Sequence, residues 1–127
     1  MRIAAAAVAL ALALVAASCG GGGPKVYENP HGTIGVKRGD VFTLRFVVNM
    51  SVGYEWQLIP FDIDSPKLQE LGTNTRYPGG NRAGESGKRS FRFRATKVGR
   101  QVLIFQHFFR GKPQDRRVLR IDVKPAS

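Results

Sequence analysis

Apolar residues alternate with polar or mixed residues along much of the chain, and this period of two limits the possible folds more than any other feature. The alternation covers residues 41–48, 54–58, 91–94 and 118–123. It is typical of half-buried antiparallel strands whose other face is wet. Over residues 102–109 the apolar run is nearly continuous, which predicts a more fully buried strand.

Groups of glycine, proline, asparagine and aspartate separate these strands. They fall at residues 29–32, 38–40, 64–66, 77–80, 98–99 and 111–113. Seven to eight short strands over about 100 residues predict an all-β fold, an immunoglobulin-like antiparallel β-sandwich. A closed barrel is the alternative. Only residues 65–71 could hold a helical turn, which Gly72 would end.

The first residues have the features of a secretory signal peptide. Arg2 precedes an unbroken apolar run over residues 3–17, which is too short for a comfortable membrane span. Cys19, the single cysteine, follows small residues and resembles the lipid-accepting cysteine of bacterial lipoproteins. Ordinary cleavage nearby, with Cys19 incidental, is the alternative.

We therefore predict a signal peptide of the lipoprotein type over residues 1–18. A lipidated Cys19 with a glycine-rich tether would follow over residues 19–24, and the folded domain over residues 25–127. The protein would be exported and lipid-anchored to the cell envelope, on its periplasmic or extracellular face. With one cysteine it must fold without an internal disulfide.

Catalytic and metal-binding motifs are not evident. His31 and His107 lack the spacing of metal ligands, and Ser86 and Ser90 have no evident partner base. We expect no cofactor, no metal and no enzymatic activity.

The chain is strongly basic, with a formal net charge of +11. Arginines and lysines cluster over residues 82–100 and 110–120. Because export argues against nucleic acid, anionic lipids, envelope polymers or an acidic protein are better partners. One hypothesis is thus an envelope lipoprotein that binds through a basic face, although such a face could also serve solubility alone.

Three segments follow one another between the predicted strands. The first is Asn49-Met50-Ser51-Val52-Gly53, followed by Tyr54 and, one residue later, Trp56. The second is Gly84-Glu85-Ser86-Gly87, ahead of Phe91, and the third spans residues 107–113. In this order the chain resembles the chagasin-type inhibitors of papain-like cysteine peptidases.

The resemblance implies a monomeric β-sandwich whose three loops gather at one end as a wedge. In that family the wedge enters the peptidase cleft and covers the catalytic cysteine and histidine. Carried over by position, the contacts would come from Asn49, Met50, Ser51, Val52, Gly53, Gly84, Glu85, Ser86, Gly87, Phe108, Phe109 and Arg110. The implied partner is a papain-like cysteine peptidase, with the membrane engaged through the N-terminal lipid.

Some positions differ from the family pattern. Met50 stands where the family usually has proline, and Val52 where it has a second threonine. Phe108 and Arg110 stand at the arginine and tryptophan positions of the third loop. We expect Trp56 and Tyr54 to belong to the core strand rather than to the contact surface.

Overall fold

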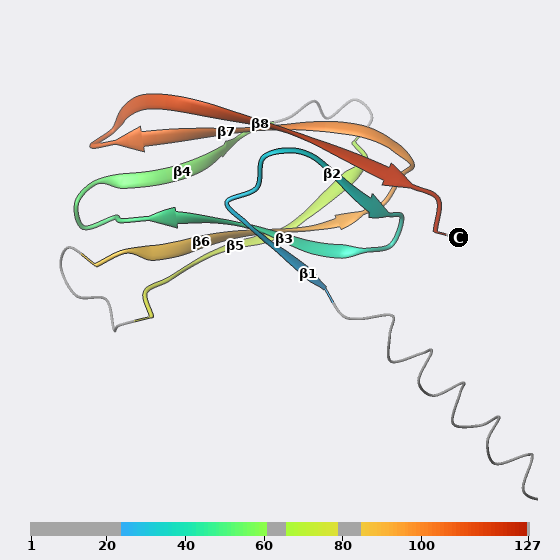
Figure 1. Ribbon diagram of the computed structural model, residues 1–127, viewed down its shortest axis with the longest axis horizontal. Coiled ribbons are helices and arrows are strands. Elements are labelled where there is room, and N and C mark those ends of the chain that lie inside the picture. Colours follow the sequence, from blue (N-terminus) through green and yellow to red (C-terminus); the bar gives the residue numbers. More distant parts are fainter. Residues whose placement is uncertain (1–23, 61–65, 79–84, 127) are drawn as a thin grey trace, which may run out of the picture.

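The computed structural model describes residues 24–60, 66–78 and 85–126, which form eight strands and no helix. One sheet has the order β1 (Lys25–Glu28), β3 (Val41–Val48), β6 (Gly87–Ala95) and β5 (Leu68–Arg76). The other has the order β2 (Gly32–Lys37), β8 (Lys112–Lys124), β7 (Gly99–Phe109) and β4 (Tyr54–Ile59). The two sheets face each other, so the predicted sandwich is confirmed (Figure 1).

The predicted signal peptide and Cys19 lie outside the described residues. Within those residues, no helix is long and apolar enough to cross a membrane.

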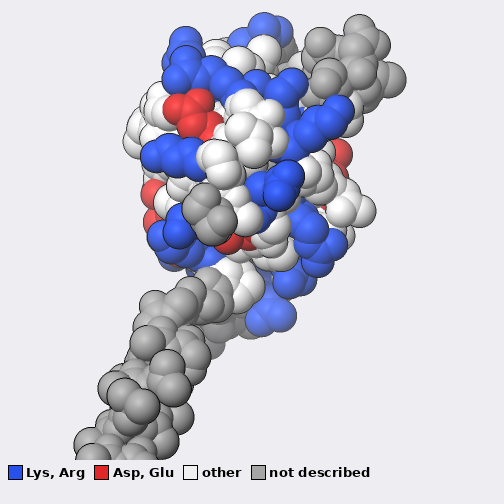
Figure 2. Space-filling model, turned by 90° about the vertical axis from the view of Figure 1, so that its right-hand side faces the viewer, with Lys and Arg blue, Asp and Glu red and all other residues white. Residues whose placement is uncertain are grey.

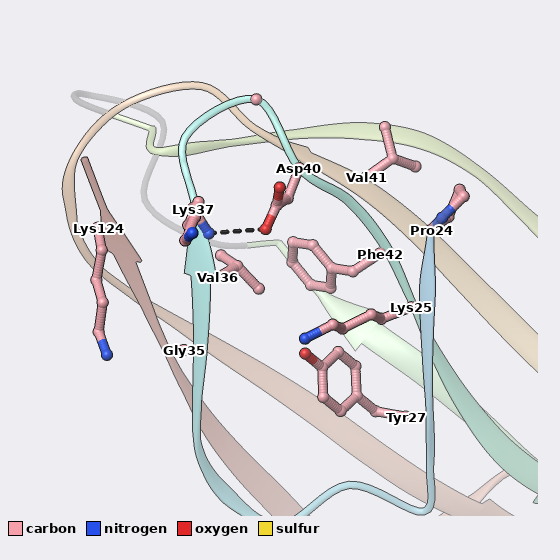
Figure 3. Close-up of a pocket in the computed structure, with 11 residues that line it drawn as sticks. Pro24, Lys25, Tyr27, Gly35, Val36, Lys37, Asp40, Val41, Phe42 and Lys124 are labelled. Carbon is pink, nitrogen blue, oxygen red and sulfur yellow. Dashed lines mark hydrogen bonds between the residues drawn. The ribbon is translucent and has the colours of Figure 1, made fainter. Parts of the chain in front are cut away.

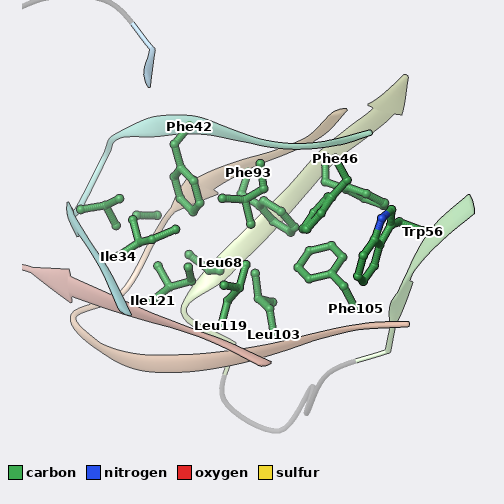
Figure 4. Packing of buried hydrophobic residues seen from close by; sticks show 14 of the residues in the cluster. Ile34, Phe42, Phe46, Trp56, Leu68, Phe93, Leu103, Phe105, Leu119 and Ile121 are labelled. Atoms are coloured by element: carbon green, nitrogen blue, oxygen red, sulfur yellow. The ribbon is translucent and has the colours of Figure 1, made fainter. Parts of the chain in front are cut away.

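One continuous core fills the space between the sheets (Figure 4). It arises from the period of two, because each strand turns alternate apolar side chains inward. Phe46 is fully buried, and its ring centroid lies 5.0 Å from that of Trp56 and 4.8 Å from that of Phe105. Full burial of an aliphatic or phenylalanine side chain contributes about 1.5–3 kcal/mol. Trp56 is only 6% exposed, which confirms its predicted place in the core.

Two strand pairs at the sheet edges run parallel, an exception to the antiparallel pairing that the sequence predicts. β1 pairs with β3, and β2 pairs with β8. The chain leaves β1, turns at Asn29 and Pro30, and enters β2 in the opposite sheet. Because this connection changes sheets, each of the two strands is free to join an edge in parallel.

Two local predictions are wrong. Residues 68–71 begin strand β5 instead of a helical turn. The segment over residues 102–109 is not continuously buried, since Val102 is 41% exposed while Leu103 is fully buried. The first error follows from pairing: the polar segment that forms β5 gains its backbone hydrogen bonds from β6, a partner that periodicity does not reveal.

Candidate functional site

The strand register brings the three predicted segments to one end of the sandwich. Val48, the last residue of β3, pairs with Gly87, the first residue of β6. Tyr54 at the start of β4 pairs with Phe109 at the end of β7. We call this end the loop end, and it comprises residues 49–53, 77–78, 85–87 and 110–111. It is the left end of the molecule in Figure 1.

The first loop, Asn49 to Gly53, is closed on itself by backbone hydrogen bonds. The carbonyl oxygen of Asn49 accepts hydrogen bonds from the backbone N–H groups of Val52, Gly53 and Tyr54 at 3.2, 2.9 and 2.9 Å. The Ser51 hydroxyl donates to the side-chain carbonyl of Asn49 at 3.0 Å. The loop therefore has a defined shape, with Met50 and Ser51 exposed at its tip.

Met50 ties this loop to the connection between β5 and β6. Its backbone N–H donates a hydrogen bond to the hydroxyl oxygen of Tyr77 at 3.0 Å. A proline at this position would have no N–H to donate. Where the family pattern stiffens the loop with proline, this chain holds it with a hydrogen bond between two loops.

The third segment is a tight hairpin rather than an open loop. Phe108 and Phe109 belong to β7, and the turn consists of Arg110 and Gly111 alone. Both turn residues have positive φ, 50° and 77°, as expected for a two-residue hairpin of type I′. The expectation of a loop over residues 107–113 is therefore wrong in extent, because cross-strand pairing of Phe109 with Lys112 continues almost to the turn.

Gly53 joins the first loop to this hairpin. Its carbonyl oxygen accepts a hydrogen bond from the backbone N–H of Arg110 at 2.8 Å. Gly53 has a φ of 105°, and a Cβ added there would lie 2.8 Å from Cγ of Arg110 and 3.2 Å from its backbone nitrogen. Glycine is thus required for both conformation and space.

The second segment is described only in part. Gly84 lies outside the described residues, Glu85 is half-buried and Ser86 is exposed. Gly87 is buried, and a Cβ there would lie 2.6 Å from the carbonyl oxygen of Arg76 and 2.7 Å from the ring of Tyr77. The room that Gly53 and Gly87 provide is therefore occupied by neighbouring segments of the same chain.

A ladder of aromatic rings extends the core to the loop end. Trp56 stacks on His107 with 4.5 Å between ring centroids, and His107 lies 5.7 Å from Tyr54. Tyr54 lies 4.6 Å from Phe109. Tyr54 begins β4, as predicted, but its side chain is 40% exposed, because it lies beyond the edge of the core on the same face as Trp56.

No cluster of three or more metal-ligating side chains occurs in the part of the chain that the structure describes. Nδ1 of His107 lies 3.1 Å from Oδ1 of Asp115, and this hydrogen bond lowers the pKa of the Asp115 carboxyl. His107 is thus engaged by a carboxylate and two aromatic rings, which suits a supporting role.

The sequence reasoning missed Tyr77 and His107 as positioning residues. Both act through contacts between segments far apart in the chain, and period-two alternation carries no information on such contacts. Tyr77 precedes Pro78, and this pair indicates a turn. The pair does not reveal that the Tyr77 hydroxyl accepts a hydrogen bond from the Met50 N–H.

Comparisons with known proteins agree with this arrangement. The profile of the chagasin family of peptidase inhibitors, I42, matches residues 35–123. No curated protein matches the chain.

Similar solved structures share the fold at low sequence identity. The cysteine protease inhibitor EhICP2 from Entamoeba histolytica has a TM-score of 0.61 at 14% identity, over 80% of this chain and 97% of that one. Amebosin has a TM-score of 0.55 at 19% identity, over 81% and 100%. PbICP-C, solved in complex with falcipain-2, has a TM-score of 0.53 at 14% identity, over 80% and 98%. Since the family profile covers well over half of the sequence, the chain belongs to the chagasin family of peptidase inhibitors.

Proposed function

We propose that the loop end of this protein inhibits papain-like cysteine peptidases by occupying their active-site cleft. Members of the chagasin family are peptidase inhibitors and not enzymes. Among the solved structures with a similar fold, EhICP2 is a cysteine protease inhibitor, and PbICP-C was solved in complex with falcipain-2.

The observation that carries the proposal is that the first loop is bonded to the connection between β5 and β6 on one side and to the hairpin turn on the other. Met50 is bonded to Tyr77, and Gly53 to Arg110, so the first loop is held from both sides. Loops fixed in advance lose little conformational entropy on docking, and more of the contact energy then appears as affinity. The exposed side chains at the tip include Met50, Ser51, Tyr54 and Arg110.

Inhibition of purified papain-like peptidases by residues 20–127 tests the proposal. This segment keeps every described residue, including the whole described core. We expect reversible inhibition that weakens on Ser51→Arg, which places a bulky charge at the exposed tip. Thr96→Arg, at an exposed position in the connection between β6 and β7, is the matched control. Absence of inhibition at micromolar concentration across several such peptidases would refute the proposal.

We also propose that the protein is an exported lipoprotein whose domain is monomeric. The support is the sequence: an apolar run over residues 3–17 followed by Cys19 and four glycines. Membrane fractionation of the wild type and of Cys19→Ala tests the anchor. Release of the variant into the soluble envelope fraction is expected, and equal membrane retention of both would contradict it. Light scattering of residues 20–127 tests the monomer.

A further inference from the structure

A hollow of about 510 Å³ lies at the end of the sandwich opposite the loop end. It forms where β1 of one sheet and β2 of the other separate, and Pro24, the first described residue, lines it. Its apolar wall includes Val36 and Phe42, and Lys25, Lys37 and Lys124 bring ammonium groups (Figure 3).

The charges of this hollow are unbalanced. None of its three lysines forms an ion pair within the described residues. Asp40 is the one carboxylate among the described lining residues, and its Oδ2 already accepts the backbone N–H of Lys37 at 2.9 Å. Three lysines and one carboxylate line the hollow, and this excess of positive charge favours an anion. Lysine binds phosphate as a point charge.

Two details shape the hollow for such a ligand. Figure 3 shows the Lys25 ammonium beside the Tyr27 hydroxyl, so a cation and a neutral hydrogen-bonding group lie together. Gly35 places no side chain on the opposite wall, and a Cβ there would lie 3.4 Å from Nζ of Lys124. The apolar wall beside these groups suits a ligand that joins a phosphate to a less polar body.

The position of the hollow indicates the source of the phosphate. Pro24, the first described residue, lies at this end, and the apolar run over residues 3–17 precedes it in the sequence. If Cys19 carries lipid, residues 19–23 span roughly 17 Å at full extension. This end of the domain would then be held against the lipid headgroups. Seen end-on, it presents many lysines and arginines and few acids (Figure 2).

We propose that this hollow binds the phosphate of an anionic lipid headgroup. The N-terminal end of the domain is seated on the membrane, and the loop end faces away from it toward an approaching peptidase. The inference rests on the proposed export and anchoring, but it assigns a binding site to the domain itself. Anionic headgroups attract each nearby lysine independently of the lipid anchor.

A second hollow, of about 620 Å³, provides the control. It lies on the outer face of the sheet that contains β5 and β6 and is lined by Arg76, Lys88 and Arg92, among others. Lys88 is partly neutralised there by Glu28, at 3.4 Å. Three cations can therefore be neutralised at either hollow with the same change in net charge.

Vesicle binding by residues 20–127, which carry no lipid, tests the site. Vesicles of phosphatidylcholine with and without phosphatidylglycerol are compared at fixed ionic strength. We expect binding only to the anionic vesicles, and a loss of about a hundredfold in the triple variant Lys25→Gln, Lys37→Gln, Lys124→Gln. Inhibition of a peptidase by the same variant is measured in parallel, so that failure of this site is distinguished from failure of the loop end.

The control variant Arg76→Gln, Lys88→Gln, Arg92→Gln should weaken vesicle binding far less. Equal loss in both triple variants would show that net charge alone matters and would overturn the assigned site. Inorganic phosphate is the remaining probe, and its binding is monitored by the NMR chemical shifts of residues around the hollow. Shifts with phosphate but no binding to anionic vesicles would identify a free anion and overturn the headgroup.

Discussion

Gly53 combines two separable requirements, a positive φ and close packing against Arg110. We predict that Gly53→Ala lowers the free energy of unfolding by about 2–6 kcal/mol, because strained backbone and overpacking each cost about 1–3 kcal/mol. Gly39→Ala is the matched control: Gly39 has a φ of 97° but no atom near an added Cβ, so only the cost of φ remains. Urea unfolding of both variants makes the comparison. Equal losses would show that packing against the hairpin turn is not tight.

The hydrogen bond between Met50 and Tyr77 can be isolated by a double-mutant cycle. Tyr77→Phe should cost about 0.5–1.5 kcal/mol of stability, since it removes the acceptor of the Met50 N–H but keeps the ring. In the background of Met50→Pro, which removes the donor, the same change should cost almost nothing. Additive losses would contradict the bond. Inhibition should weaken with Tyr77→Phe, because this change releases the first loop from its neighbour.

At the scale of the element, some strands can be predicted from the pattern of their own residues and others cannot. β3, β6 and β8 were predictable because apolar residues alternate over their buried stretches, and the same reasoning placed Trp56 in the core. β5 was not, because Gln69, Asn74 and their neighbours are polar and exposed, and the strand exists through its pairing with β6.

The site was predictable to a similar degree. The order of the first two segments and the motif from Asn49 to Gly53 indicated where the loops lie. The extent of the third segment could not be predicted, because Arg110 adopts a positive φ that is unusual for arginine and lets the hairpin close in two residues. The bond to Tyr77 was equally out of reach, since it joins residues from different loops.

Strand β8 carries two carboxylates with lowered pKa values, and each is bonded to a side chain of β7. A hydrogen bond from His107 lowers the pKa of Asp115, and a hydrogen bond from Arg100 lowers that of Asp122. A folded-state pKa below the unfolded value, near 3.9, stabilises the fold above that pH, and the stabilisation is lost as the pH falls through the folded pKa. We therefore predict that stability declines as the pH falls below about 4.

Asp115→Asn and Asp122→Asn test this dependence by urea unfolding at several pH values. Each variant should be less stable than the wild type near neutral pH and should converge with it at the acid end. Both carboxylates are exposed, so each difference should be small. If the difference in stability between each variant and the wild type stayed constant with pH, these two carboxylates would not be the source of the pH dependence.

At the scale of the whole molecule, one core joins both sheets and leaves the two ends free for separate partners. Because the buried cluster is continuous, we predict that residues 20–127 unfold in a single transition. Trp56, the single tryptophan, stacks on Phe46 and reports on the loop-side half of the core. Its fluorescence should follow the same denaturant curve as far-ultraviolet circular dichroism. Separate midpoints would show that the two halves fold independently.

The separation of the ends also explains how one small domain could be both anchored and inhibitory. The loop end consists of connections at the ends of β3, β5 and β7, whereas Pro24 and Lys124 lie at the other end. Seating the second end on a surface leaves the first accessible.

Binding to a peptidase whose cleft is open or blocked tests the central claim most directly. Calorimetry would compare a papain-like peptidase made inactive by replacing its catalytic cysteine with alanine and the same peptidase with its cleft filled by a covalent small molecule. The account predicts binding of residues 20–127 to the open cleft and loss of that binding when the cleft is filled. Equal affinity for both forms would contradict it, because the loop end would then not occupy the active site.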